Sequence, residues 1–227
     1  MNQAAVERVA FVGLGVMGYP MAGHLAAKGY QVTVFNRTQA KADQWATEHG
    51  GSSAATPAEA ARGVHAVFAC VGNDDDIRAV TMGPDGAFHG MSKGAVFIDH
   101  TTASAEVARE LYDEAKSREL EFLDGPVSGG QAGAENGTLT VMCGGEEQWF
   151  ELSKPVIESY SQTCNLIGPP GSGQLTKMVN QICIAGLVQG LSEGINFGTK
   201  AGLNMEEVIE VISKGAAQSW QMENRYK

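Results

Sequence analysis

The chain has 227 residues, of which 43% are hydrophobic, and a formal net charge of −10. Such a surface repels phosphate backbones and anionic membranes, so binding to nucleic acid or to a lipid surface is not expected. No apolar run approaches the roughly 20 residues of a membrane span, and the N-terminus lacks an apolar run of signal-peptide length, so we expect a cytoplasmic protein.

Short apolar runs alternate with longer amphipathic segments over most of the chain. Strands are predicted at residues 8–13, 32–35, 66–71, 95–99, 121–124, 139–144 and 164–168. Helices are predicted at residues 17–28, 39–49 and 104–120, and another begins with a capping box at Thr56, Pro57 and Glu59. Several strands are apolar on both faces. Residues 1–168 are therefore predicted to form a Rossmann-type α/β domain with a doubly wound, mainly parallel sheet.

The alternation ends at the sequence GPPGSG, residues 168–173. Residues 172–200 then read as one long helix and residues 204–214 as another. Residues 169–227 are therefore predicted to be an interdomain helix and the start of an all-α C-terminal domain. The last 25 or so residues are too few for a core of their own. We expect them to pack on a partner subunit or to belong to a longer polypeptide.

Four glycines recur at four-residue spacing along the long helix, namely Gly186, Gly190, Gly194 and Gly198. Glycine costs about 1 kcal/mol per site in a helix relative to alanine. Their regular spacing predicts that another backbone packs closely against this ridge, although the chain is rich in glycine. We therefore expect a homodimer or homotetramer formed through the long helix and the C-terminal domain.

The four cysteines, Cys70, Cys143, Cys164 and Cys183, are widely spaced and form no CxxC pair. Each has apolar neighbours, which predicts buried, reduced thiols. No metal site is expected from this pattern.

A glycine-rich loop follows the first strand. Gly13, Gly15 and Gly18 stand in GxGxxG spacing, and the next strand completes a βαβ unit. This arrangement lets the pyrophosphate of a dinucleotide approach a helix N-terminus; the alternative is a merely tight turn. The residues expected at the cofactor here and at the end of the 66–71 strand are Gly13, Leu14, Gly15, Met17, Gly18, Val71, Gly72 and Asn73.

The end of the second strand indicates which dinucleotide binds. NAD sites usually carry an acid here for the ribose 2′-hydroxyl, but this chain has Asn36, Arg37 and Thr38. A guanidinium and a hydroxyl suit a 2′-phosphate, so NADP(H) is favoured over NAD(H). The alternative is that Arg37 is simply solvated and Thr38 caps the next helix.

The sequence DGPVSGG, residues 124–130, follows a predicted strand, and its glycines predict a flexible, open loop around Ser128. The Ser128 hydroxyl and the backbone N–H groups of Gly129 and Gly130 could hold the carboxylate of a small substrate. A serine nucleophile would need a histidine base, and the nearest candidate, His100, is interpreted as a packing residue or as a side chain that supports the residues at the site.

The long helix places Lys177, Asn180, Gln181 and Ile184 on one face. A cation and two amides there could be a solvated face. If Lys177 is buried, its pKa falls and the side chain suits proton transfer.

These stretches resemble the β-hydroxyacid dehydrogenase family. The resemblance rests on FVGLGVMGYPMAGHL, FNRT, DHTTAS, DGPVSGGQAGAENGTLTVMCGG and GSGQLTKMVNQ, in that order along the chain. It implies Lys177 as the general acid/base and Thr102 near nicotinamide and substrate. It also implies substrate contacts from Ser128, Gly129, Gly130, Asn180 and Gln181. Members usually have a longer C-terminal helical domain than this sequence contains.

The resemblance implies an NADP(H)-dependent oxidoreductase of a small carboxylate-bearing substrate. The class includes 3-hydroxyisobutyrate, glyoxylate, and succinic or tartronate semialdehyde. One alternative is an imine reductase of the same fold, but such enzymes typically lack the lysine. The other is a non-catalytic dinucleotide-binding module.

Overall fold

The computed structural model describes residues 6–226 of the chain and divides into two compact units, one ending at Lys177 and the other beginning at Met178. The sequence predicts a domain boundary after residue 168, where the last strand ends. In the structure, the first turns of the long helix belong to the unit that contains the sheet.

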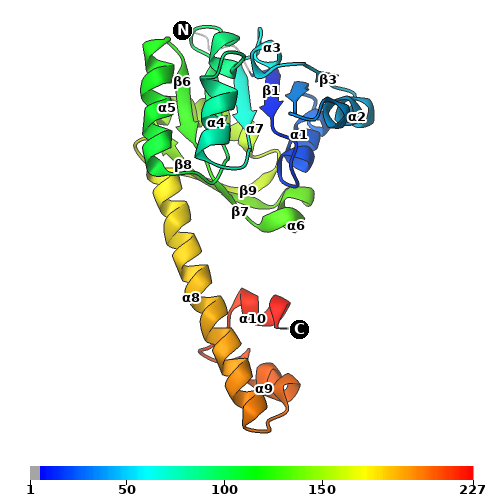
Figure 1. Ribbon diagram of the computed structural model, residues 1–227, viewed down its shortest axis with the longest axis vertical. Coiled ribbons are helices and arrows are strands. Elements are labelled where there is room, and N and C mark those ends of the chain that lie inside the picture. Colours follow the sequence, from blue (N-terminus) through cyan, green and yellow to red (C-terminus); the bar gives the residue numbers. More distant parts are fainter. Residues whose placement is uncertain (1–5, 227) are drawn as a thin grey trace. The chain divides into compact units, whose positions relative to one another are not determined.

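The first unit is built on one nine-stranded sheet (Figure 1). Its strands are β1 (Arg8–Val12), β2 (Gln31–Phe35), β3 (Ser52–Ser53), β4 (Ala66–Ala69), β5 (Val96–Asp99), β6 (Glu121–Asp124), β7 (Val127–Ser128), β8 (Leu139–Gly145) and β9 (Ser161–Gly168). Strands β3-β2-β1-β4-β5-β6 are parallel and adjacent in that order, which is the doubly wound order of dinucleotide-binding domains. β8 is antiparallel to β6 and β7 and parallel to β9. The predicted Rossmann-type sheet is confirmed.

Helices follow the strands along the chain. In the first unit they are α1 (Gly18–Ala27), α2 (Gln39–His49), α3 (Pro57–Ala60), α4 (Asp74–Thr81), the short 3₁₀ helix η1 (Ala87–His89), α5 (Ala105–Ser117), α6 (Gly130–Glu135) and α7 (Glu147–Ile157). α8 (Ser172–Lys200) begins in the first unit and continues into the second, which also holds α9 (Met205–Ile212) and α10 (Trp220–Arg225).

Alternate residues of the central strands enter separate hydrophobic clusters on the two faces of the sheet. In β1, Val9 and Phe11 pack in one cluster with Trp45 of α2, whereas Ala10 and Val12 pack in the other. The second cluster includes side chains of α5 such as Leu111. Strands covered on both faces must be apolar at every position, which explains the continuous apolar runs in the sequence.

The start of α3 follows its sequence signal. Thr56 is the N-cap residue, its side chain accepts a hydrogen bond from the Glu59 N–H at 3.1 Å, and Pro57 opens the helix. The Glu59 carboxylate accepts from the N–H of Ala55, one residue earlier than an ideal capping box requires.

Two sequence expectations are wrong. Ser128 does not lie in an open loop, because Val127 and Ser128 form β7 and pair with β8. Cys183 is exposed on α8 and not buried, although all four cysteines are free thiols as predicted. Both errors concern tertiary neighbours that local sequence does not reveal.

The second unit leaves much of the glycine ridge on α8 open. Apart from the adjacent backbone of α8 itself, no atom of the described chain lies within 4 Å of where a Cβ would stand on Gly186, Gly190 or Gly194, whereas Gly198 packs against Met205. Among residues 6–226, close packing of a second backbone on Gly186, Gly190 or Gly194 is thus not seen. None of the helices in the described range has the length and apolarity that crossing a bilayer requires.

Candidate active site

A cleft of about 390 Å³ opens at the carboxyl ends of β1, β2 and β4. Most of the residues expected at the cofactor line this cleft, including Gly13, Gly15, Met17, Asn36, Arg37, Thr38, Val71 and Gly72. The remaining lining residues are Val12, Val16, Phe35, Cys70, Asp76 and Val80. Segments from three separate strand ends therefore form one cavity, as a dinucleotide site on this type of sheet requires.

The three glycines of the glycine-rich loop differ in what a Cβ at their positions would contact. Gly13 has a φ of +93°, and a Cβ there would meet the carbonyl oxygen of Cys70. A Cβ on Gly18 would meet the carbonyl oxygen of Gly13. Gly15 has no neighbour within 4 Å of its Cβ position, so a ligand can approach its backbone. α1 also begins without a side-chain cap, although the Tyr19 N–H in its first turn already donates to the Gly15 carbonyl at 3.1 Å.

The end of β2 is tied to the glycine-rich loop. The Asn36 Oδ1 accepts from the Leu14 N–H at 3.0 Å, and its Nδ2 donates to the carbonyl of Thr38 at 3.1 Å. Asn36 therefore positions both segments. Thr38 stands at the N-cap of α2 but makes no side-chain cap hydrogen bond, so its hydroxyl is not committed to the helix. Arg37 is 92% exposed and pairs with Asp76 at 3.8 Å.

Other predicted cofactor residues shape the cleft without lining it. Leu14 and Gly18 are buried beneath the loop. Asn73 is the N-cap of α4 and accepts from the Asp76 N–H at 2.9 Å. Thr102 is exposed in the segment that follows β5. Taken together, the open space at Gly15, the absence of a side-chain cap on α1 and the uncommitted Thr38 hydroxyl fit a bound dinucleotide.

The second group of site residues lies at the ends of β5 and β6. These strands are paired with Asp99 opposite Asp124, so the segments that carry Thr102 and Ser128 leave the same edge of the sheet. Ser128 is half-buried, and Gly129 and Gly130 are exposed with φ values of +133° and +63°. Positive φ at two consecutive positions explains why glycine is needed after Ser128.

Lys177 reaches this group from α8. Its Nζ donates a hydrogen bond to the carbonyl of Val127 at 2.8 Å, next to Ser128 in the chain. The side chain is half-buried, and desolvation holds the pKa of Lys177 below its usual value. Proximity of Lys177 to the Ser128 segment was predicted only through the family resemblance, since the two are 49 positions apart.

The first turn of α8 is fixed by buried polar groups. The Asp124 carboxylate accepts from the N–H groups of Gly171 at 2.7 Å and Gln174 at 2.9 Å. The fully buried Gln174 side chain donates to the carbonyl of Thr101 at 2.7 Å and accepts from the Ala103 N–H at 3.1 Å. Gln174 thus holds the residues on either side of Thr102.

Sequence reasoning missed Asp99, Asp124 and Gln174. Burial raises the pKa of Asp99 to about 7, aided by the charges of Asp124 and Asp74. One Asp99 oxygen, Oδ2, is buried without a hydrogen-bond partner in the described structure. Burial also raises the pKa of Asp124, although its backbone hydrogen bonds oppose this. For Asp99 and Asp124, the signal available in the sequence was an acid directly at the end of an apolar strand.

His100 is a packing residue, as interpreted. It is buried, its ring lies within hydrogen-bonding distance of the Gly125 carbonyl and the Tyr160 hydroxyl, and it stacks on Phe68. Desolvation lowers the pKa of His100 to about 4, so the ring is neutral at physiological pH. It is therefore unsuited to act as a proton carrier there.

Asn180 and Gln181 lie on α8 in the second unit, where the Asn180 amide donates to Gln181 Oε1 at 3.0 Å. Their contact with substrate stays a prediction. Among residues 6–226, no three His, Cys, Asp or Glu side chains are gathered as metal ligands would be.

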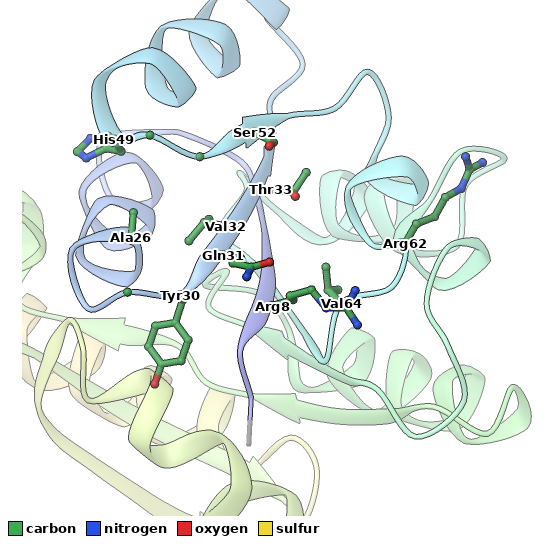
Figure 2. Close-up of a pocket in the computed structure, with 13 residues that line it drawn as sticks. Arg8, Ala26, Tyr30, Gln31, Val32, Thr33, His49, Ser52, Arg62 and Val64 are labelled. Atoms are coloured by element: carbon green, nitrogen blue, oxygen red, sulfur yellow. The ribbon is translucent and has the colours of Figure 1, made fainter. Parts of the chain in front are cut away.

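Another cleft, of about 430 Å³, opens near the C-terminal ends of α1 and α2 (Figure 2). It is lined by Tyr30, Gln31 and Val32 and by two arginines, Arg8 and Arg62. Figure 2 shows the Arg62 guanidinium extending away from Gln31 and Val32. The cationic groups do not converge on one point, so no ligand site is assigned there.

Two family models match the chain. Residues 8–168 match the NAD-binding domain of 6-phosphogluconate dehydrogenase, and residues 171–227 match the NAD-binding region of NADP-dependent 3-hydroxyisobutyrate dehydrogenase. An uncharacterised oxidoreductase from Shewanella frigidimarina is 64% identical over 98% of this chain and 76% of its own length.

A probable mitochondrial 3-hydroxyisobutyrate dehydrogenase-like protein from Arabidopsis thaliana is 40% identical over 93% of this chain and 70% of its own length. Among solved structures, 3-hydroxyisobutyrate dehydrogenase from Mycobacterium tuberculosis with L-serine has a TM-score of 0.87 at 30% identity. That match covers 95% of this chain and 72% of the other.

The two loop glycines Gly13 and Gly15 allow a matched test of the cleft. Gly15→Ala fills open space beside the loop, so we expect normal stability but at least tenfold weaker NADPH binding, which fluorescence titration measures. Gly13→Ala forces a Cβ against the Cys70 carbonyl at positive φ, so its thermal midpoint falls clearly. Unchanged NADPH affinity in a folded Gly15→Ala variant would place the dinucleotide elsewhere.

Asp99 makes stability depend on pH. Its folded-state pKa of about 7 lies above the unfolded value, so the folded protein binds this proton more tightly. The stability that Asp99 itself contributes should therefore fall as pH rises from about 4 through 7. Asp99→Asn removes this titratable group. Urea unfolding at pH 5 and pH 8 should therefore show that the unmodified chain loses about 1–3 kcal/mol more free energy of unfolding over this range than the variant does. Parallel curves for both proteins would contradict this.

Proposed function

The chain belongs to the β-hydroxyacid dehydrogenase family of NAD(P)-dependent oxidoreductases, and from this premise we propose that it interconverts a small hydroxyacid and its carbonyl form with NADP(H), using Lys177 as general acid/base. The observation that carries the proposal is the half-buried Lys177 ammonium hydrogen-bonded beside Ser128. Membership of the family is shown by the matches above.

The proton step follows from the position of Lys177. Its Nζ can donate a proton to a substrate carbonyl oxygen during reduction, or accept one from a hydroxyl during oxidation. The hydrogen bond to the Val127 carbonyl holds the amine at the start of the Ser128 segment. Because desolvation lowers the pKa of Lys177, the neutral amine forms at lower pH than it does on an exposed lysine.

Substrate orientation is assigned to the Ser128 segment. The Ser128 hydroxyl and the N–H groups of Gly129 and Gly130 can bind a carboxylate, which fixes the neighbouring reacting carbon relative to Lys177. Thr102, Asn180 and Gln181 are proposed as further polar contacts. The bound nicotinamide supplies or accepts the hydride. The residues at the glycine-rich loop and the end of β2 would hold that cofactor.

A preference for NADP(H) over NAD(H) is proposed from Arg37 and Thr38. The Arg37 side chain is 92% exposed at the cleft, where it pairs with Asp76 at 3.8 Å, and the Thr38 hydroxyl makes no cap hydrogen bond. The missing cap hydrogen bond weakens the alternative in which Thr38 serves only as a helix cap, whereas the exposure of Arg37 fits either interpretation. The substrate belongs to the class of short carboxylate-bearing aldehydes and hydroxyacids. L-serine joins it as a candidate, since a similar structure was solved with it.

The alternatives are distinguished by Lys177. An imine reductase or a non-catalytic dinucleotide-binding module would not need a half-buried lysine next to a carboxylate cradle. A non-catalytic module would bind NADPH without turning over any substrate of this class. A cytoplasmic location stays a prediction.

We also propose a homodimer or homotetramer formed through α8 and the C-terminal helices. Ile182 and Phe197 on α8 are 72% and 73% exposed, and the ridge at Gly186 and Gly190 is open. Apolar side chains this exposed on one helix are typical of a surface that a second copy covers.

The role of Lys177 is tested by following dinucleotide absorbance with glyoxylate, succinic, tartronate and methylmalonate semialdehydes, 3-hydroxyisobutyrate and L-serine. We expect Lys177→Ala to lower kcat by about 10²- to 10⁴-fold and to leave NADPH affinity unchanged. Lys28→Ala, on the exposed surface, is the charge control. Turnover by Lys177→Ala equal to that of the control would show that another group carries the proton.

The pH profile gives a second readout of the same residue. Oxidation needs the neutral Lys177 amine, so its kcat/KM should rise with pH and reach half its maximum below the pKa of an exposed lysine. Reduction needs the ammonium and should fall over the same range. Lys177→Arg remains protonated and should lose the oxidation activity. Identical pH profiles for both directions would contradict the assignment.

Association is tested by sedimentation equilibrium. We expect a dimer or tetramer for the unmodified chain and a smaller species for Ile182→Glu, because a buried charge opposes association. Lys28→Glu changes the charge of an exposed position in the first unit, outside the proposed interface, and serves as the control. A stable monomer of the unmodified chain would refute the proposed interface.

A further inference from the structure

Three consecutive acids begin α4, and each carboxylate has a different environment. Asp74 accepts from the Ser104 N–H at 2.8 Å and from its hydroxyl at 2.5 Å. The Asp75 side chain is 97% exposed and lies 3.5 Å from Arg78. Asp76 lines the cofactor cleft. Of these three acids, Asp76 alone faces the place where a dinucleotide would bind.

Asp76 stands opposite the group proposed to bind the 2′-phosphate. Its Oδ1 lies 3.8 Å from the Arg37 Nη1. Its Oδ2 lies 2.5 Å from where a Cβ on Gly72 would stand, so the carboxylate covers Gly72 inside the cleft. The Asp76 side chain is 39% exposed, so water screens its charge only in part.

The start of α4 does not depend on a carboxylate at this position. An acid in the first turn of a helix is favourable because it complements the helix dipole, but Asp74 and Asp75 supply the same interaction. The Asn73 side chain caps the helix through the Asp76 backbone N–H, which any residue except proline would provide. What distinguishes the Asp76 side chain is therefore its position against Arg37.

We propose that Asp76 is a specificity-determining residue that limits the preference for NADP(H) over NAD(H). It pairs with Arg37 in the free protein, so a 2′-phosphate must compete for the guanidinium. It also repels that phosphate, which carries close to two negative charges at neutral pH. NAD(H) lacks the 2′-phosphate, so neither the competition for Arg37 nor the repulsion by Asp76 opposes its binding. The inference rests on the proposed function only in placing a dinucleotide in this cleft.

The test is equilibrium binding of NADPH and NADH, followed by fluorescence, to the unmodified chain and two variants. Asp76→Asn removes the charge in the cleft. Asp75→Asn is the matched control, since it removes one negative charge from the same helical turn outside the cleft. We expect Asp76→Asn to bind NADPH about three- to tenfold more tightly, with NADH affinity changed less than twofold. Asp75→Asn should change neither affinity by more than twofold.

Salt provides an independent readout. The gain in NADPH affinity should shrink between 50 mM and 500 mM NaCl, because ions screen the repulsion at a partly exposed site. Equal NADPH affinities for the two variants would overturn the inference and leave the proposed function intact. Weaker NADH binding by Asp76→Asn would also overturn it, because Asp76 would then be a ribose contact. If neither dinucleotide binds the unmodified chain, the cofactor assignment fails and this inference fails with it.

Discussion

The Asp124 carboxylate at the start of α8 is the interaction on which the arrangement of the site depends. Its oxygens accept hydrogen bonds from the N–H groups of Gly171 and Gln174, which would otherwise be buried without partners at the helix N-terminus. A Cβ on Gly173 would lie 2.8 Å from the Asp124 backbone oxygen, so only glycine fits between strand and helix. This close junction fixes the direction of the first turns of α8 and brings Lys177 to the Val127 carbonyl.

The same interaction explains why Lys177 can have a lowered pKa in an acidic protein. Asp124 is satisfied by backbone N–H groups and the helix dipole, not by a cation. Lys177 forms no ion pair in the described structure, and its only recorded side-chain hydrogen bond goes to a neutral carbonyl. Desolvation is then the one effect on its pKa, and it favours the neutral amine. A paired carboxylate would have had the opposite effect.

Patterns in the sequence predict those helices and strands whose formation depends on residues close together in the chain. The long helix is predicted with the bounds of α8, and the apolar runs mark the parallel strands, because both faces of those strands are covered. β7 was missed because a two-residue strand exists only through pairing with β8. Gln174 was missed because its side-chain partners, Thr101 and Ala103, lie more than 70 positions earlier in the chain. Such hydrogen bonds leave no periodic trace in the sequence.

The cofactor cleft shows the same limit in its electrostatics. A motif at the end of β2 identifies Arg37 and Thr38, but the field at a 2′-phosphate is a sum over every element that lines the cleft. Asp76 comes from α4, outside the β1–α1–β2 unit that carries the glycine-rich loop, and it lies near Arg37 because β2 and β4 both flank β1 in the sheet. The cation identified at one strand end is therefore only one of the charges that set the electrostatic field at a 2′-phosphate. The strength of discrimination depends on the charges that the fold brings beside it.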